Sequence, residues 1–460
     1  MTKGFVPTPA VIVDLMVDKL FCAGPPKVGA SLLDPGCGEG EFIEGVLRWC
    51  GARGLPLPQI VGVEADVGRA RAARKRFADV TNVRILQEDF LCATDSRFDY
   101  IVGNPPYVPI TGLSLAERER YRRRYLTAKG RFDLYLLFFE QALQLLRTGG
   151  TLVFITPEKF TYVDTARPLR ELLLRMRIDE LHFLDESTFG DLVTYPLVST
   201  ITAAPPTRST RVVIRSGAKA SVQLSASSSW LPRILGHSHE ASAFTLSDAC
   251  VRISCGVATG ADSVFVMRDD ELPTALAPFA HATISGRQIT ERGSFQTRSS
   301  MLVPYDLSGR LLPEAQLRSL GRYLSDPTRR AQLLGRTCVA HKAWYAFHEN
   351  PPMRDVLRPK LICKDITQTP FFVVDRKGDI IPRHSTYYIV PDGSVDLDAL
   401  ADHVNSPASG EWLRAHCQRA ANGFLRLQSH VLKQLPVPAS LVPSGLAAQR
   451  LAFDAEALPA

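Results

Sequence analysis

The chain of 460 residues contains no apolar run that reaches the roughly 18 residues of a membrane-spanning helix. Its first segment, Met1–Thr8, lacks the basic stretch followed by an apolar one that a secretory signal peptide requires. We therefore expect a cytoplasmic protein with no membrane partner.

The cysteines and histidines lack the spacings of a metal site. The nine cysteines are scattered, and the closest pair, Cys250 and Cys255, has no C-x-x-C companion. None of the ten histidines lies in an H-E-x-x-H pattern. We expect no metal ion, and thiols that stay reduced. A convincing P-D…(D/E)-x-K constellation is also missing, so we do not expect a restriction nuclease within the chain.

The chain is only mildly basic. It has 54 Lys and Arg against 47 Asp and Glu, a net charge of +7. Such a charge is compatible with a polyanionic partner without requiring one. A length of 460 residues allows two or three domains, each with its own core.

Strand-like and helical patterns alternate through the first half of the chain. Thr8-Pro9 has the form of an N-cap and a first helical residue, and apolar residues at helical spacing continue from there to Leu20. Buried-strand patterns cover residues 31–34, 60–64, 83–86, 98–102, 151–155 and 181–184, with helical patterns between most of them. The alternation predicts an α/β domain with a doubly wound, mostly parallel sheet, which binds ligands at the carboxyl ends of its strands.

A glycine-rich turn, Asp34-Pro-Gly36-Cys-Gly38-Glu-Gly40, follows the first strand. It departs from the dinucleotide fingerprint G-x-G-x-x-G, and its leading acid would repel a pyrophosphate. An acid suits a cationic ligand instead, and the amino and sulfonium groups of S-adenosylmethionine are cationic. Glu64 ends the second strand and can accept hydrogen bonds from ribose hydroxyls. Asp89, at the end of the third, can accept one from an adenine amino group, while Phe90 packs on the ring. Taken alone, the turn is equally consistent with a tight connection.

The tetrapeptide Asn104-Pro105-Pro106-Tyr107 follows the fourth strand. Its prolines fix φ and remove two backbone donors, which leaves the Asn104 side-chain oxygen and the Pro105 carbonyl as acceptors. Two fixed acceptors on an exocyclic amine would localise the nitrogen lone pair and stabilise the positive charge that grows during methyl transfer. Tyr107 offers an aromatic face for stacking the base. The alternative is a proline turn with a buried tyrosine.

These motifs resemble those of the gamma-class amino methyltransferases, and among them the TaqI-type adenine DNA methyltransferases. Residues 98–107 are similar to the catalytic motif of that family almost residue for residue, and residues 33–38, 62–64 and 89–90 to its cofactor motifs. The resemblance implies a class I S-adenosylmethionine-dependent methyltransferase fold. Ala65 departs from the family pattern, in which an isoleucine packs on the cofactor adenine.

The resemblance also implies roles for three further side chains. Thr8 would contact the methionine carboxylate, and Phe138 would line the pocket for the cofactor adenine. Phe189 matches the residue that packs against the flipped target base, although Tyr195 lies nearby in the sequence.

An arginine-rich stretch lies between Tyr107 and Lys129. We expect DNA phosphates to be contacted by four basic residues here, Arg122, Arg123, Arg124 and Lys129. The alternative is the solvated face of a helix.

The second half of the chain loses the alternation beyond residue 205. Pro205-Pro206 and the serine-rich residues 221–229 indicate a boundary. We therefore divide the chain into a catalytic domain, residues 1–225, and a mixed α+β target recognition domain, residues 226–460. Segments that resemble the TaqI-type specificity domain follow in order at residues 253–260, 264–265, 284–289, 343–345, 358–362, 387–390 and 421–428.

The sequence thus predicts transfer of a methyl group from S-adenosylmethionine to the N6 amino group of an adenine flipped out of double-stranded DNA. The second domain would clamp the duplex and contact flanking bases. The enzyme would be the modification enzyme of a restriction-modification system, with a separately encoded endonuclease as an open partner.

Three alternatives remain. An N-P-P-Y methyltransferase acting on an RNA guanine or a protein glutamine amide tends to lack so large a second domain. A DNA specificity subunit without catalysis has little reason to keep Asp34, Glu64, Asp89 and Asn104 together. Cytosine amino methyltransferases more often carry a serine where this chain has Asn104.

Overall fold

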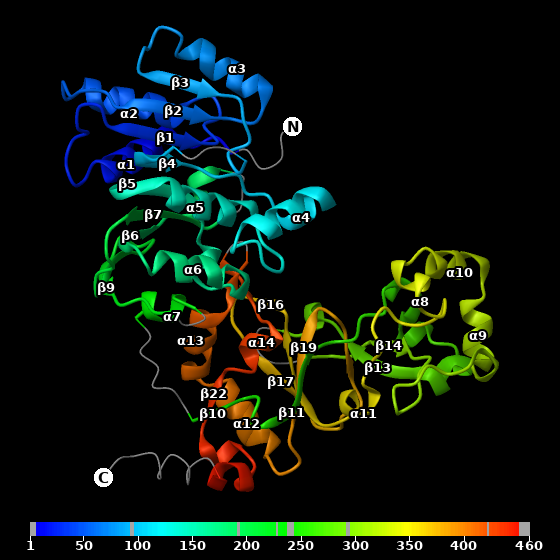
Figure 1. Cartoon of the computed structure of the whole chain (residues 1–460). Helices are drawn as coiled ribbons and strands as arrows, with labels where there is room; N and C mark the ends of the chain where they lie inside the picture. Colours follow the sequence, from blue (N-terminus) through cyan, green and yellow to red (C-terminus); the bar gives the residue numbers. More distant parts are fainter. Residues whose placement is uncertain are drawn as a thin grey trace. The chain divides into compact units, whose positions relative to one another are not determined.

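The computed structural model describes residues 6–92, 96–190, 194–226, 229–236, 243–290, 295–420 and 423–449. Its internal contacts divide the chain into two compact units, Met1–His237 and Ser238–Ala460 (Figure 1). This boundary lies beyond residue 225 because Trp230 still packs into the first unit. The Trp230 side chain is fully buried, its backbone N–H donates to the Thr161 carbonyl at 2.8 Å, and its ring meets Phe160 edge to face at 6.3 Å between centroids.

A nine-stranded sheet forms the centre of the first unit, with its strands in the order β3-β2-β1-β4-β5-β7-β6-β8-β9 (Figure 1). The strands from β3 to β5 pair in parallel, and β7 runs antiparallel between β5 and β6. The predicted doubly wound, mostly parallel sheet is confirmed. Its strands are β1 (Ser31–Pro35), β2 (Gln59–Val63), β3 (Val83–Leu86), β4 (Phe98–Gly103), β5 (Leu146–Pro157), β6 (Arg177–Phe183), β7 (Pro196–Thr202), β8 (Thr210–Val213) and β9 (Lys219–Val222).

Helices cover both faces of this sheet because successive strand residues point to opposite sides. Leu32 belongs to the core under α1 and α2, and its neighbour Leu33 belongs to the core under α5 and α6. The same alternation recurs in β4, where Ile101 and Val102 enter different cores. The helices of the unit are α1 (Ala10–Leu20), α2 (Glu41–Gly51), α3 (Val67–Arg76), α4 (Leu115–Arg124), α5 (Leu134–Leu145), α6 (Arg167–Leu173) and α7 (Leu231–Ile234).

Two local predictions in this unit are wrong. The N-cap of α1 is Pro9, and no side chain bonds to the cap. Thr8 is not the cap, because its hydroxyl accepts a hydrogen bond from Asn104 instead. β5 begins at Leu146, before the predicted residue 151, because Leu146 already pairs with Phe98 of β4.

The second unit contains small sheets with helices between them. Its two larger sheets follow the orders β11-β19-β15-β17 and β12-β14-β13-β18. Its strands are β10 (Phe244–Thr245), β11 (Cys250–Cys255), β12 (Val266–Arg268), β13 (Ala280–Ile284), β14 (Ser299–Leu302), β15 (Lys360–Lys364), β16 (Ile366–Thr367), β17 (Phe372–Asp375), β18 (Ile381–Pro382), β19 (Thr386–Pro391), β20 (Gln418–Arg419), β21 (Leu425–Arg426) and β22 (Pro436–Val437). Its helices are α8 (Asp262–Phe265), α9 (Arg318–Leu324), α10 (Pro327–Leu334), α11 (Met353–Val356), α12 (Leu397–Val404), α13 (Pro407–His416) and α14 (Ser429–Leu432).

A buried ion pair joins β15 to β17 in this unit. The ammonium group of Lys360 lies 2.5 Å from the Asp375 carboxylate, and neither side chain is more than 2% exposed. Asp375 also accepts hydrogen bonds from the backbone N–H groups of Gly378 and Ile380.

Among the helices of the described ranges, none is long and apolar enough to cross a membrane.

Candidate active site

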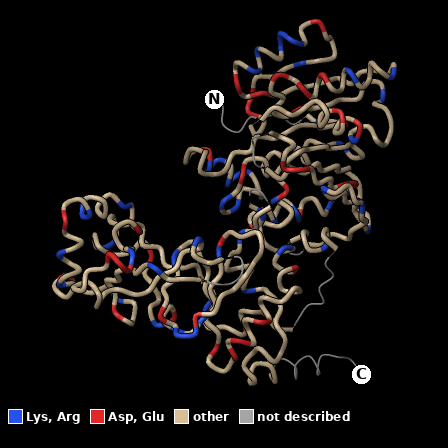
Figure 2. Tube along the Cα trace, turned by 180° about the vertical axis from the view of Figure 1, so that it is seen from behind, with Lys and Arg blue, Asp and Glu red and all other residues tan. Residues whose placement is uncertain are grey.

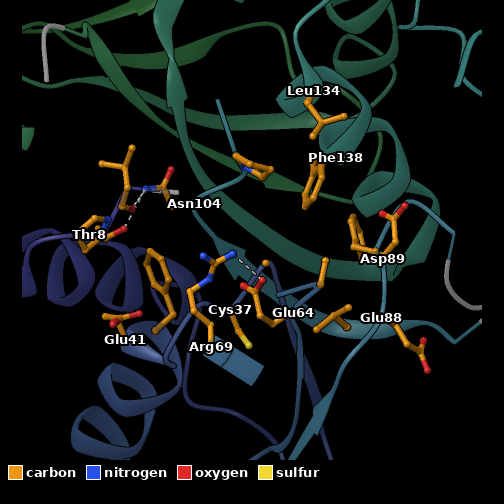
Figure 3. A pocket seen from close by; sticks show the side chains of 18 of the residues that line it. Thr8, Cys37, Glu41, Glu64, Arg69, Glu88, Asp89, Asn104, Leu134 and Phe138 are labelled. Atoms are coloured by element: carbon orange, nitrogen blue, oxygen red, sulfur yellow. Dashed lines mark hydrogen bonds and ion pairs between the residues drawn. The ribbon is translucent and has the colours of Figure 1, made fainter. Parts of the chain in front are cut away.

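A cavity of about 280 Å³ lies at the carboxyl ends of β1, β2 and β4 (Figure 3). Seven of the predicted site residues line it, namely Thr8, Gly36, Glu64, Asp89, Phe90, Asn104 and Phe138. The lining also includes residues that we did not predict, among them Cys37, Glu41, Arg69, Glu88, Glu117, Tyr121 and Leu134. The other predicted residues do not line it; these are Asp34, Gly38, Pro105, Tyr107, Phe189, Arg122, Arg123, Arg124 and Lys129.

The turn after β1 depends on glycine. Gly36, Gly38 and Gly40 have φ values of 83°, 58° and 97°, in the left-handed region that L side chains rarely adopt. The backbone N–H of Gly36 donates to the Val63 carbonyl at 2.7 Å, which holds the turn against the end of β2. A Cβ atom at Gly40 would lie 2.2 Å from the ring of Phe77, so this position has no room for a side chain.

Glu64 is a buried acid at the end of β2, with 4% of its surface exposed. One carboxylate oxygen accepts from the backbone N–H of Gly38 at 3.0 Å. The other accepts from the backbone N–H of Asp66 at 2.7 Å and from the guanidinium of Arg69 at 2.9 Å. Glu64 therefore fixes the glycine-rich turn as well as lining the cavity.

Asp34 is completely buried beneath the same turn. Burial, with the nearby charges of Glu41 and Glu64, raises the pKa of its carboxyl well above the usual value. Within the described part of the chain, neither of its carboxylate oxygens has a hydrogen-bond partner. The cost of ionising an unpaired buried carboxyl explains the direction of the shift.

An aromatic slot forms one side of the cavity. The rings of Phe90 and Phe138 lie 5.0 Å apart between centroids at an angle of 44°. Asp89 lies next to this slot, and its carboxylate accepts from the backbone N–H of Leu91 at 3.0 Å and from Arg120 at 3.2 Å. A flat apolar ring with a polar edge group fits such a slot and acid.

Asn104 lies beside Thr8 on one side of the cavity, across from Asp89 (Figure 3). Its amide nitrogen donates to the Val6 carbonyl and to the Thr8 hydroxyl, each at 3.1 Å. A carbonyl can only accept, so these bonds fix which way the amide faces. The amide oxygen of Asn104 is buried and has no partner among the residues that the structure describes.

The side chain of Tyr107 contacts β5 and α5. Its hydroxyl donates to the Ile155 carbonyl at 3.3 Å, and its ring meets Tyr135 edge to face at 6.3 Å. Burial raises the pKa of the Tyr107 hydroxyl, so the group stays protonated. Pro105 is buried next to Asn104. Tyr107 thus anchors the tetrapeptide to β5.

Phe189 and Tyr195 both precede β7 in the chain. Phe189 ends a short 3₁₀ helix, Glu186–Phe189, and is partly buried against the core under α1 and α2. The Tyr195 carbonyl accepts from the backbone N–H of Glu158 at 2.8 Å, and the Arg215 guanidinium lies 4.9 Å from the centre of the Tyr195 ring.

The predicted phosphate contacts lie on or after α4. Arg122, Arg123 and Arg124 form its last turn and are exposed, as is Lys129. Arg123 also lies 3.7 Å from Glu119 one turn earlier. Figure 2 shows basic and acidic residues together along this helix, which is in keeping with its sequence.

The charges around the cavity suit a cationic ligand. Five acids line it, namely Glu41, Glu64, Glu88, Asp89 and Glu117, against one basic residue, Arg69. Arg69 is already paired with Glu64. Acidic side chains and an aromatic slot fit S-adenosylmethionine. The described ranges contain no group of three or more His, Cys, Asp or Glu side chains that could hold a metal ion.

Some of the lining residues gave a signal in the sequence and others did not. Glu41 follows the glycine-rich turn directly, so its place at the start of α2 could have been anticipated. Glu117 and Tyr121 lie within the arginine-rich segment, where only charge was evident. Their approach to the cavity depends on how α4 packs.

The strand order of the sheet, with β7 reversed between β5 and β6 and a glycine-rich turn after β1, is that of a class I S-adenosylmethionine-dependent methyltransferase. Residues 66–189 match the family described as Eco57I restriction-modification methylase. The matched segment includes Asp89 and the Asn104–Tyr107 tetrapeptide. The chain thus has a class I methyltransferase fold, and this segment of it is similar to restriction-modification methylases.

Curated relatives extend this relationship over the whole chain. The Type II methyltransferase M.PaeR7I of Pseudomonas aeruginosa is 27% identical over 95% of this chain and 86% of its own length. The modification methylase CviBIII of Paramecium bursaria Chlorella virus NC1A is 36% identical, over 35% of this chain and 40% of its own. The chain is thus a homologue of Type II methyltransferases.

One solved structure has a similar fold over most of the chain. It is the ATP-dependent Type ISP restriction-modification enzyme LlaBIII bound to DNA, with a TM-score of 0.53 and 10% identity. The similarity covers 84% of this chain but only 33% of that enzyme's chain. At this identity the likeness concerns the fold alone.

Proposed function

We propose that this methyltransferase transfers a methyl group from S-adenosylmethionine to the N6 amino group of an adenine flipped out of double-stranded DNA. The observation that carries the proposal is the Asn104 amide oxygen, which is buried without a partner in the described chain, on a residue that lines an acid-rich cavity. A buried acceptor without a donor costs free energy, about 1–3 kcal/mol, unless a ligand supplies the donor. An amino group on the target base would do so.

Residues around the cavity would hold the methyl donor. Glu64 would accept from the ribose hydroxyls, Asp89 from the adenine amino group, and Phe90 and Phe138 would pack on the adenine ring. Thr8 would contact the methionine carboxylate, and Gly36 and Gly38 leave space for the backbone to approach the ligand. Asp34 would supply negative potential from beneath the turn once the positive charge of the ligand lowers its raised pKa. When bound, S-adenosylmethionine offers an electrophilic methyl group on a sulfonium sulfur.

The tetrapeptide would activate the acceptor amine. The Asn104 oxygen and the Pro105 carbonyl would each accept one N–H of the amine, which pulls the nitrogen toward tetrahedral geometry and stabilises its growing positive charge. The bonds from Asn104 to Val6 and Thr8 fix the oxygen in place before the base arrives. No strong general base is needed, because the proton leaves after transfer.

The DNA would be held outside this cavity. We assign phosphate contacts to Arg122, Arg123, Arg124 and Lys129 and the stacking contact with the flipped base to Phe189. Residues 226–460 would clamp the duplex and contact flanking bases. Names of the relatives, Type II methyltransferases and a modification methylase, favour a role in modification, with an endonuclease encoded separately.

Labelled S-adenosylmethionine tests the proposal directly. The purified protein is incubated with bacterial DNA, total RNA or a protein extract, and the labelled DNA is sequenced as single molecules to locate N6-methyladenine. We expect label in DNA alone and a modified adenine within a short fixed sequence. Label confined to RNA or protein, or DNA carrying only N4-methylcytosine, would refute the proposal. Asn104→Ala is the inactive control.

A further inference from the structure

Helix α4 presents one face to the cofactor cavity. Residues spaced by three and four lie on the same side of a helix, and Glu117, Arg120 and Tyr121 have this spacing. Glu117 and Tyr121 line the cavity. Arg120 donates to the Asp89 carboxylate at 3.2 Å and to the Tyr121 hydroxyl oxygen at 3.3 Å.

We propose that α4 is a further wall of the adenine site, in which Tyr121 contacts the adenine and Arg120 is a positioning residue that orients the Asp89 carboxylate. The proposal rests on the proposed function, because it takes S-adenosylmethionine as the ligand. It adds two residues that the sequence motifs do not include.

The hydrogen bonds of Asp89 explain why it needs an orienting partner. Its side chain is 37% exposed, so solvent alone would leave it mobile. The backbone N–H of Leu91 holds one carboxylate oxygen at 3.0 Å, and the other accepts from Arg120 at 3.2 Å and from the weaker donor, the Cys92 thiol, at 3.3 Å. A carboxylate has about four acceptor sites, so these bonds leave room for an adenine amino group.

The ion pair between Arg120 and Asp89 does little for folding. Both side chains are half exposed, at 51% and 37%, and solvent screens a pair of this kind. Its loss should therefore change the direction of the carboxylate more than the stability of the fold. This separates a positioning role from a structural one.

Tyr121 can supply a hydrogen-bond donor to the adenine ring. The side chain is 4% exposed, and burial raises the pKa of its hydroxyl to about 12, so the proton is retained at neutral pH. The hydroxyl oxygen already accepts from Arg120, which leaves the O–H free to point to a ring nitrogen. Arg120 thus orients both polar groups that would meet the adenine edge.

Arg118 provides a matched control on the same helix. Its guanidinium donates to the carbonyls of Leu113 at 3.0 Å and Thr111 at 3.4 Å, and it is not among the residues that line the cavity. Arg118→Ala removes an arginine from α4 without touching Asp89. Thermal unfolding of each variant reports whether the fold survives.

Calorimetric titration of the full chain with S-adenosylhomocysteine and S-inosylhomocysteine tests the proposal without any activity assay. In the inosine analogue, a carbonyl replaces the adenine amino group whose N–H would donate to Asp89. We expect the wild type to prefer S-adenosylhomocysteine. Arg120→Ala should weaken this ligand about tenfold, the scale of one oriented hydrogen bond, and should lower the preference. Arg120→Lys should restore part of the affinity and part of the preference. Arg118→Ala should change neither the affinity nor the preference.

Three results would overturn the proposal, and they are distinguishable. Unchanged affinity and preference in Arg120→Ala would remove the positioning role while leaving the proposed function intact. Equal weakening by Arg118→Ala and Arg120→Ala would mean a general loosening of α4. A wild type that binds neither ligand would reject the proposed function as well. Tyr121→Phe, which keeps the ring, should lose affinity severalfold, and unchanged binding would exclude the hydroxyl contact.

Discussion

The side-chain amide of Asn104 donates to the Thr8 hydroxyl at 3.1 Å, although 96 residues separate the two in the chain. This bond, with the one to the Val6 carbonyl, uses both N–H groups of the amide. The amide oxygen must then face away from both acceptors. A segment preceding α1 therefore sets the direction of the group at the end of β4 that we propose as catalytic.

Thr8→Val tests this relationship because it keeps the shape of the side chain and removes the hydroxyl. With one of two anchors lost, we expect kcat to fall about tenfold, or about 1.4 kcal/mol in the barrier. Thr8→Ser retains the hydroxyl and should keep most of the activity. Asn104→Ala should cost more, about 10²–10³ in kcat, the scale of losing one preorganised polar group. Equal activity in the Val and Ser variants would contradict the anchoring role.

The sheet and the strand ends could be predicted from sequence because local patterns determine them. Asp34 lies near the end of β1, and Glu64 and Asp89 follow β2 and β3. The alternation of these strands with helices is evident, and parallel strands bring their carboxyl ends to one edge. The bond between Thr8 and Asn104 could not be predicted, since helix-capping preference assigned Thr8 to α1. The contact of Arg120 with Asp89 depends on the packing of α4, which composition does not encode.

Gly40→Ala should damage the cofactor turn through a steric clash. A Cβ atom would lie 2.2 Å from the Phe77 ring, at a residue with φ of +97°. We expect the free energy of unfolding to fall by more than the roughly 1–2 kcal/mol that a left-handed backbone costs an L residue. S-adenosylhomocysteine should also bind more weakly. Gly54→Ala is the control, because Gly54 has φ of +60° and no atom within 4 Å. Adding Phe77→Leu should restore part of the loss, and no rescue would argue against the clash.

Asp34→Asn should stabilise the protein at neutral pH. The folded pKa of Asp34 is raised, so the unfolded chain releases this proton first, and stability falls as pH rises from about 3.9 toward the folded value. The amide removes the ionisable group, so the stability of the variant relative to the wild type should rise with pH and shrink in acid. Thermal unfolding of both proteins at pH 5 and pH 8 measures this difference in stability. A variant no more stable than the wild type at either pH would contradict the buried, unpaired carboxyl.

Salt dependence tests the predicted phosphate contacts. If Arg122 and Arg123 each neutralise one phosphate, replacing both with alanine should lower the slope of log K against log salt concentration by about 1.8. Arg71 and Lys75 are exposed on α3, and their double alanine variant removes the same charge elsewhere. Fluorescence anisotropy with a labelled duplex gives both slopes. Equal slopes for the two double variants would show that position on α4 does not matter.

Variants at Phe189 and Tyr195 show which of the two side chains stacks on the flipped base. We propose Phe189, and Phe189→Ala should lower kcat/KM by the worth of one stacked base, about 1–3 kcal/mol, with little change in cofactor affinity. Tyr195 has its carbonyl bonded to Glu158 and its ring beside Arg215, so Tyr195→Phe should leave kcat/KM nearly unchanged. Placing 2-aminopurine at the target adenine reports flipping by fluorescence, since an unstacked base brightens and a stacked one is quenched. If Tyr195→Ala, rather than Phe189→Ala, gave the brighter complex and the lower kcat/KM, the base would stack at the start of β7, and the assignment to Phe189 would be wrong.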